Sequence, residues 1–194
     1  MNWRAILSDS EGATIIEFAI VVPLFLVLLL GIMDVGQMVY GKSVLAGAVR
    51  KAARESSLET RNTSEADAMV LEMIRPVLPG VTISTSRKSY YDFSDIGRAE
   101  KWNDSNKNGQ CDNNETYTDE NRNGQWDEDV GKADSDGGAS DVVVYTVNAS
   151  FEPVFKVPFL PALWADRTLT STAVTRNQPF ATQAGYGSSA GSCA

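Results

Sequence analysis

The fold is decided by one stretch of the sequence, Ala13-Thr-Ile-Ile-Glu17-Phe-Ala-Ile-Val-Val-Pro23-Leu-Phe-Leu-Val-Leu-Leu-Leu-Gly31-Ile-Met33, which is the most apolar part of the 194-residue chain. About 20 apolar residues are enough for a helix to cross a lipid bilayer. The stretch therefore predicts one membrane-spanning helix near the N-terminus.

A cleaved secretory signal peptide is the alternative interpretation. Such a signal has a basic leader, a shorter apolar stretch and a small-residue cleavage site after it. Here the leader carries Arg4 against Asp9 and Glu11, and the small residues 46–48 lie well beyond the apolar stretch. We therefore expect the helix to stay in the chain.

An acidic residue, Glu17, lies inside the apolar stretch. An ionisable side chain in a membrane helix is costly and by default functional, unless it lies near enough to the interface to reach water. Gly12, followed by Ala-Thr-Ile-Ile-Glu-Phe, resembles the processing site of type IV pilin-like proteins. The longer pattern Glu-Gly-Ala-x-x-x-Glu-Phe-Ala-x-x-x-Pro, from Glu11 to Pro23, is similar to the TadE-like pseudopilins of the tight-adherence (Flp) pilus system.

This resemblance implies a set of roles for the N-terminal residues. A prepilin peptidase would cut between Gly12 and Ala13 on the cytoplasmic side. Glu17 would then accept a charge-assisted hydrogen bond from the Ala13 ammonium of a neighbouring subunit, which removes two charges from lipid at once. Phe18 belongs to the same motif, and Pro23 would weaken the helix where it lacks an N–H.

The resemblance also implies partners and a location. The partners would be the prepilin peptidase, other pilin or pseudopilin subunits, the pilus assembly machinery and the lipid bilayer. The chain would cross the bacterial inner membrane once, with a cytoplasmic N-terminus and a periplasmic or extracellular head. Basic residues disagree with this orientation, because the positive-inside rule favours the side that carries more of them. Arg4 precedes the apolar stretch, whereas four basic residues follow it closely: Lys42, Arg50, Lys51 and Arg54.

The remaining pattern predicts an α+β fold, in which a long membrane-spanning stalk helix carries a second helix and a small antiparallel β-sheet head. One helix face is indicated by the apolar spacing of Val35, Met38, Val39, Leu45, Val49, Ala52 and Ala53. A second helix should begin with Ser64 as N-cap and Asp67 at its third position. Strands are expected at 81–86, 141–151 and 168–176.

The expected organisation has four parts. Residues 1–12 form a leader peptide and 13–58 the membrane and stalk helix. Residues 59–180 form the head, and 181–194, rich in Gly, Ser and Ala, a flexible tail. An apolar segment at 153–164 is interrupted by prolines. It either closes the core or forms an exposed apolar surface that binds a partner subunit or the membrane interface.

An acidic insertion at 101–136 contains ten acidic and four basic residues and repeats itself. The first copy fits the calcium-loop pattern D-x-[DN]-x-[DN]-G-x5-E throughout. Its candidate ligands are Asp104, Asn106, Asn108, Gln110 through its carbonyl, Asp112 and Glu115. A solvated loop without an ion is the alternative. Such a donor set suggests weak affinity, at about 0.1 to 1 mM, which suits an extracytoplasmic site.

The second copy follows fifteen residues later and is less complete. Its candidate ligands are Asp119, Asn121, Asn123, Gln125 and Asp127. Position 12 holds Val130, so the last carboxylate would have to come from Glu128 or Asp129. We therefore expect one calcium ion in the first loop and leave the second open.

The two cysteines, Cys111 and Cys193, are compatible with one disulfide that ties the tail to the insertion, or with two free thiols. The net charge of −8 argues against a nucleic-acid partner. Because the chain has no His, serine-protease-like triads and His metal ligands are excluded, and we expect no enzyme.

Two functions remain from the sequence. The first is a minor pilin or pseudopilin that acts in Flp pilus assembly, with a calcium-stabilised head. The second is a membrane-anchored calcium-dependent binding or adhesion protein that does not enter a pilus.

Overall fold

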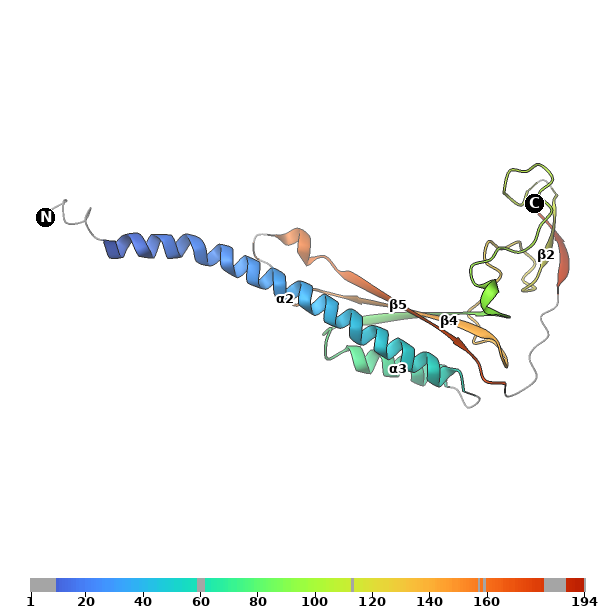
Figure 1. The fold of residues 1–194 in the computed structure, drawn as a ribbon, viewed down its shortest axis with the longest axis horizontal. Helices are drawn as coiled ribbons and strands as arrows, with labels where there is room; N and C mark the ends of the chain where they lie inside the picture. The colour runs from blue at the N-terminus through green and yellow to red at the C-terminus, as the bar shows by residue number, and fades with distance from the viewer. Residues whose placement is uncertain are drawn as a thin grey trace.

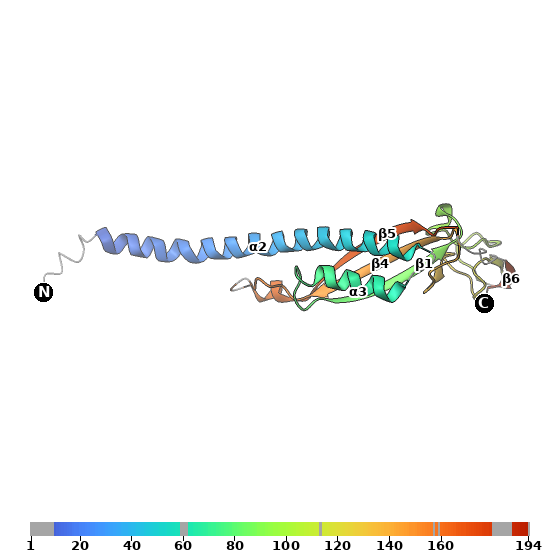
Figure 2. The same ribbon diagram turned by 90° about the horizontal axis from the view of Figure 1, so that it is seen from below.

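The computed structural model describes residues 10–58, 62–112, 114–156, 158, 160–179 and 188–193. Helix α2 (Ser10–Ser56) runs along most of an elongated molecule. A sheet packs beside its C-terminal half, and a lobe of loops lies at the end opposite the start of the helix (Figures 1 and 2). At 1.5 Å per residue, α2 is roughly 70 Å long. The predicted long N-terminal helix is confirmed.

The C-terminal half of α2 forms one wall of the core. Its fully buried residues recur at spacings of three and four, which place them on one face: Leu45, Ala48, Val49 and Ala52. Val35 and Val39, expected on the same face, are instead exposed. At about 100° per residue, Val39 lies roughly 120° around the helix from Leu45, so it points away from the sheet.

Helix α3 (Thr63–Ile74) packs against α2, but its N-cap differs from the predicted Ser64. Asn62 adopts the extended backbone of a cap residue, and its side-chain oxygen accepts from the Glu65 N–H at 3.3 Å. Ser64 already lies inside the helix, and its hydroxyl donates to the Asn62 side-chain oxygen at 2.6 Å. The cap therefore belongs to the polar residue just before the first helical turn.

The main sheet is antiparallel, in the order β3-β1-β4-β5. Its strands are β1 (Thr82–Tyr90), β3 (Lys132–Ala133), β4 (Val142–Phe151) and β5 (Arg167–Arg176). Strand β4 pairs along its whole length with β5, Phe151 standing opposite Arg167, and with β1 as far as Ser150, which stands opposite Thr82. The three predicted strands are present, and the sheet is small and antiparallel as expected. Strand β1 runs four residues further than predicted.

The central strand β4 separates a covered face from a polar face. Alternate residues, among them Tyr145, Val147 and Ala149, are buried against the helices. The other face carries cross-strand hydroxyl pairs such as Thr146 with Thr172, 3.2 Å apart. The period of two in the sequence thus decides which face the helices cover.

Residues 14–33 of α2 include its most apolar window, none of which is buried by the protein, and are called the bare half below. The apolar segment at 153–164 lies at the end of the sheet nearest this bare half (Figures 1 and 2). It contains the short 3-10 helix η2 (Pro161–Trp164). Val154, Leu160 and Trp164 are each more than 40% exposed. Their exposure favours the surface interpretation over core closure for these three residues.

The chain's C-terminal end forms a strand where a flexible tail was expected. Strand β6 (Ser189–Ser192) pairs antiparallel with β2 (Thr116–Asp119) of the insertion, with Gly191 opposite Tyr117. Residues 181–187 and 194 of the expected tail lie outside the described residues. A single 3-10 turn, η1 (Phe93–Asp95), leads from β1 toward the insertion.

Candidate functional site

The N-terminal half of α2 is the first candidate site. Among the described residues, one helix is long and apolar enough to cross a membrane, at Thr14–Ser56, and none of its most apolar window is buried by the protein. Glu17 and Phe18 lie exposed on this bare half. Pro23 lies inside the helix, which continues on both sides of it. Such a helix fits a single-pass membrane protein.

The two expected processing residues, Gly12 and Ala13, fall in the first turn of α2, which begins at Ser10. The expected leader at 1–12 lies largely outside the described residues. The cleavage expected between Gly12 and Ala13 thus stays a prediction.

An ion pair ties the head to α2 directly after the apolar stretch. The Arg167 guanidinium, at the start of β5, donates to the Asp34 carboxylate at 2.7 Å. The Asp34 side chain is 8% exposed, so the charge is held away from water. This contact places the apolar segment at 153–164 close to the end of the bare helix half.

A second ionic cluster joins α3 to the sheet. Arg87 and Tyr145 both donate to the Asp67 carboxylate, and the Arg87 guanidinium lies 4.3 Å from the centroid of the Tyr145 ring. Burial by itself would raise the pKa of Asp67, but hydrogen bonds from Arg87, Tyr145 and Thr85 lower that pKa below its usual value. Burial first, and then the Asp67 charge, raise the pKa of Tyr145.

The repeated acidic insertion forms two similar loops at the far end of the head. In loop 1 (residues 104–115), the Asp104 carboxylate accepts from the N–H groups of Asn108 and Gly109 at 3.1 and 2.9 Å. Gly109 has a φ of +77°, a conformation that glycine adopts without strain. The side-chain amides of Asn106 and Asn108 both donate to Asp112, at 3.0 Å each.

Loop 1 is closed by Glu115. Its Oε1 accepts from the N–H groups of Ser105 and Asn106 at 2.7 and 3.3 Å. Glu115 is 6% exposed, and within the described residues its Oε2 has no hydrogen-bond partner. A buried carboxylate oxygen without a donor is costly, so it is a position where a cation would be stabilising.

Loop 2 (residues 119–130) repeats the same internal contacts. The Asp119 carboxylate accepts from the N–H groups of Asn123 and Gly124 at 3.1 and 2.9 Å. The side-chain amides of Asn121 and Asn123 both donate to Asp127, at 2.7 and 2.6 Å. The structure therefore joins the sequence-predicted Asp and Asn residues of each copy in one set of hydrogen bonds.

Glu100 contacts loop 2 and was not among the residues expected from the sequence. Glu100 accepts through Oε1 from the N–H groups of Glu120 and Asn121 at 2.7 and 3.4 Å, and through Oε2 from the Asp127 N–H at 3.2 Å. Glu100 is fully buried, and burial raises the pKa of its carboxyl, although these hydrogen bonds oppose the effect. The repeat carries a signal for it, because Glu100-x-Trp-x-Asp104 matches Glu115-x-Tyr-x-Asp119.

The two loops pair through a short antiparallel bridge between Trp102 and Tyr117. The Asn103 N–H donates to the Thr116 carbonyl at 2.9 Å, and the Thr118 N–H donates to the Lys101 carbonyl at 2.8 Å. The bridge makes the lobe approximately two-fold symmetric, so each loop stands beside the segment that enters the other.

Within the described residues, no group of three or more Asp, Glu or Cys side chains is arranged so that it could hold a metal ion. The contacts give a reason: the side-chain NH2 groups of Asn106 and Asn108 both donate to the Asp112 carboxylate and so occupy its two oxygens. In an ion-bound loop, the oxygen ends of these amides would face the cation instead. Calcium binding accordingly stays a prediction for these residues.

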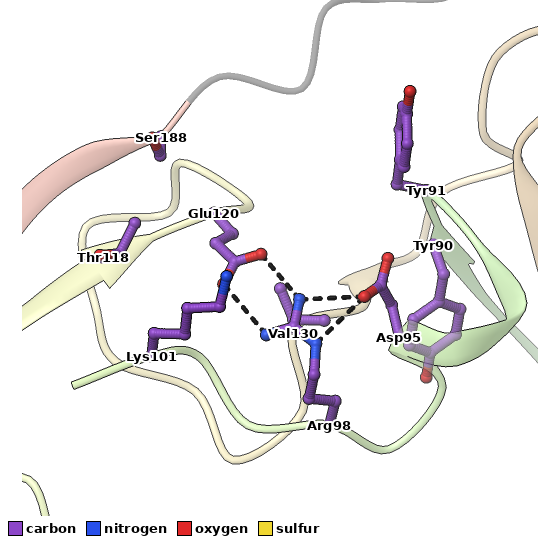
Figure 3. Close-up of a pocket in the computed structure, with 9 residues that line it drawn as sticks. All are labelled: Tyr90, Tyr91, Asp95, Arg98, Lys101, Thr118, Glu120, Val130 and Ser188. Atoms are coloured by element: carbon purple, nitrogen blue, oxygen red, sulfur yellow. Dashed lines mark hydrogen bonds and ion pairs between the residues drawn. The ribbon is translucent and has the colours of Figure 1, made fainter.

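The insertion is anchored at two further places. A disulfide joins Cys111 of loop 1 to Cys193, with the Cα atoms 5.5 Å apart. Arg98 donates to Glu120 at 2.7 Å and pairs with Asp95 at 3.0 Å, at one wall of a cavity of about 390 Å³ (Figure 3). The hydrogen bond to Glu120 is the main cause that raises the pKa of Arg98. These contacts attach the lobe to the head.

Comparison with known proteins identifies the N-terminal segment. The model of the TadE-like protein family matches residues 12–54, so the resemblance inferred from the sequence is confirmed for that segment. The match covers the bare half of α2 and most of its packed half, and it ends before α3. No curated protein and no solved structure matches the chain. The family indicates involvement in the Tad pilus system and association with a membrane.

Proposed function

We propose that this protein is a minor pilin or pseudopilin that acts in assembly of a Flp (Tad) pilus. The observation that carries the proposal is α2 itself, in which a bare apolar half with a TadE-like sequence continues without a break into a half that is built into the core. A rigid connection of this kind transmits the position of the membrane segment directly to the head. A simple anchor would need no such continuity.

Glu17 is the residue on which assembly depends in this proposal. Prepilin peptidase would cut between Gly12 and Ala13, and the new Ala13 ammonium of one subunit would pair with Glu17 of its neighbour. Glu17 is exposed in the single chain, so it is accessible to such a partner. Pairing lowers the cost of both charges in lipid, which makes association within the membrane favourable.

In this proposal the head lies on the periplasmic side, close to the membrane. The segment at 153–164 lies at the end of the head nearest the bare helix half (Figure 1). It carries the exposed side chains of Leu160 and Trp164, and Trp favours the membrane interface. The basic residues that follow the apolar stretch would then be held next to the head rather than in the cytoplasm.

Intact mass of the protein purified from its native membrane tests the processing step. We expect a mature chain that starts at Ala13, and a chain of full length from Gly12→Val. Recovery of residues 1–12 on the wild-type protein, from cells with an active prepilin peptidase, would contradict the proposal.

Glu17→Gln tests the assembly step, with Ile16→Leu as a matched neighbouring control. We expect both variants to be processed and inserted in the membrane. Crosslinking to other pilus subunits should be lost for Glu17→Gln only. Equal crosslinking of the two variants would favour the anchored binding protein over the pilus subunit.

We propose further that calcium orders the insertion. The support comes from the ligand spacing of loop 1 and from the buried Glu115 Oε2, which has no donor among the described residues. Calcium at millimolar concentration should raise the unfolding temperature of the lobe, and a chelator should reverse the rise. Asp104→Asn should reduce the effect. An unfolding temperature that does not respond to calcium would contradict this part of the proposal.

An anchored calcium-dependent binding protein is the second candidate. It is favoured by the position of the lobe, which lies at the end of the molecule far from the bare helix half (Figure 1). An uncut chain that tolerates Glu17→Gln and binds a surface ligand only with calcium would support it.

A further inference from the structure

We propose that Glu100 supplies the closing carboxylate of loop 2, so that the two loops form a paired centre for two calcium ions. In this centre each loop is closed by the glutamate that lies four residues before the first ligand of the other loop. The inference rests on the proposed calcium binding and deepens it, because it assigns a ligand set and a partner loop to each ion.

The contacts of Glu100 and Glu115 match at Oε1 and at the backbone N–H, whereas Oε2 accepts from the Asp127 N–H in Glu100 and has no donor among the described residues in Glu115. Each Oε1 accepts from the two N–H groups that follow the first ligand of its loop, at 2.7 and 3.3 Å for Glu115 and at 2.7 and 3.4 Å for Glu100. Each glutamate also donates its own N–H, at 2.9 Å, to an aspartate carbonyl: Glu115 to Asp112 and Glu100 to Asp127. Glu100 therefore occupies, over loop 2, the place that position 12 occupies over loop 1.

The two carboxylates expected from the sequence do not reach this place. Asp129 accepts from the Lys88 ammonium at 2.7 Å and from the Tyr90 hydroxyl at 2.9 Å, contacts that hold it against β1. Glu128 is exposed, and Val130, at position 12 of the second copy, is buried against Tyr90. The fold places the Glu100 carboxylate at this position instead.

Burial separates this arrangement from an ordinary acidic surface loop. Glu100 is 0% exposed and Glu115 is 6% exposed, although both carry a carboxylate. The Oε2 atom of Glu115 is buried and has no donor in the described part of the chain. Two buried carboxylates beside four loop aspartates repel one another, and two divalent cations would offset that repulsion.

Each ion would then have the same set of carboxylates. Loop 1 offers Asp104, Asp112 and Glu115; loop 2 offers Asp119 and Asp127, and Glu100 adds the third carboxylate there. The side-chain oxygens of two asparagines in each loop and the carbonyls of Gln110 and Gln125 bring the number to the six or more oxygens that calcium needs. The centre is suited to a hard cation, because no sulfur or imidazole takes part.

Calcium titration of the full chain in detergent micelles, after removal of bound metal, tests the inference. The measurement is calorimetric stoichiometry with calcium alone as the probe, on the wild type and on three conservative variants. We expect two ions for the wild type and for Glu128→Gln. Glu115→Gln and Glu100→Gln should each lose one ion, or bind one of the two at least about tenfold more weakly.

The failure modes are distinct. A wild type that binds no calcium would overturn the proposed calcium binding altogether. Two ions with unchanged affinity in Glu100→Gln, or loss of one ion in Glu128→Gln, would overturn the role of Glu100 while calcium binding itself stands. If Glu100→Gln does not fold, as judged by tryptophan fluorescence without calcium, Glu100→Asp decides. It keeps the charge, withdraws the carboxylate by one methylene and should weaken one site only.

Discussion

Arg167 and Asp34, 133 residues apart in sequence, form an ion pair of 2.7 Å at the point where the bare half of α2 meets the head. Removing Arg167 would leave the Asp34 carboxylate buried without this partner. We expect Arg167→Ala to lower the free energy of unfolding by about 3 kcal/mol, measured by urea unfolding in detergent. Lys156→Ala is the control, because its pair with Glu152 is exposed and should contribute less than about 1 kcal/mol. Equal effects of the two variants would contradict the prediction.

The Asp67 cluster predicts loss of stability in acid. Because the folded pKa of Asp67 lies below the ordinary aspartate value of 3.8, the cluster stabilises the head above that pH. This stability is lost as the pH falls through the lower, folded pKa. We expect the difference in unfolding temperature between wild type and Asp67→Asn to be largest near pH 7 and to shrink toward pH 3. The exposed Asp166→Asn should follow the wild type at every pH, and a constant difference for Asp67→Asn would rule the explanation out.

The disulfide between Cys111 and Cys193 spans 82 residues of sequence. In a chain-entropy model, a bridge of this span stabilises the folded state by up to about 4.5 kcal/mol. Cys193→Ser should therefore lower the unfolding midpoint in urea and increase hydrogen exchange in β2 and β6. A reducing agent should shift the wild type to the same midpoint and leave the double Cys→Ser variant unchanged. A reductant that shifts the double variant as well would show that the effect is not the disulfide.

Gly191 lies against the ring of Tyr117, where a Cβ atom would collide with the ring carbons. Gly191→Ala should separate β6 from β2 and destabilise the lobe by about 1–3 kcal/mol, the usual cost of overpacking. Hydrogen exchange of residues 116–119 reports the change locally. Ser192→Ala, at an exposed neighbouring position, is the control. Unchanged protection in Gly191→Ala would mean that the pairing does not depend on this contact.

Local periodicity made some of the fold predictable from sequence. Two patterns were visible within single elements: the buried face of α2 around Leu45 and Val49, and the alternation of buried and exposed residues around Tyr145 in β4. The N-cap was misplaced, because Asn62 and Ser64 are both good caps and only the backbone distinguishes them. Strand β6 is made of small residues, and its pairing depends on a distant Tyr117 and a disulfide, which no local pattern contains.

Sequence patterns predicted the candidate ligands within each loop but not Glu100. The ligands within each loop follow one another along the chain, so a pattern that runs forward from Asp104 or Asp119 finds them. Glu100 stands nineteen residues before Asp119, outside any such pattern. The pairing of the two copies around the Trp102–Tyr117 bridge brings it next to loop 2. The position of this carboxylate therefore depends on how the two copies pair in the folded chain.

Glu100 precedes loop 1 and closes loop 2, whereas Glu115 closes loop 1 and precedes loop 2. Neither loop is therefore complete without the other. Deleting residues 104–115 would remove one loop and, with Glu115, the residue directly before β2, the strand that leads into the other loop. Residues 99–129 contain Glu100 and nearly all of both loops, while β6 and Cys193 lie outside this segment. The ends of the segment already meet, since the Val130 N–H donates to the Arg98 carbonyl at 2.8 Å. A segment whose ends touch can be transplanted into a hairpin of another protein without stretching the host.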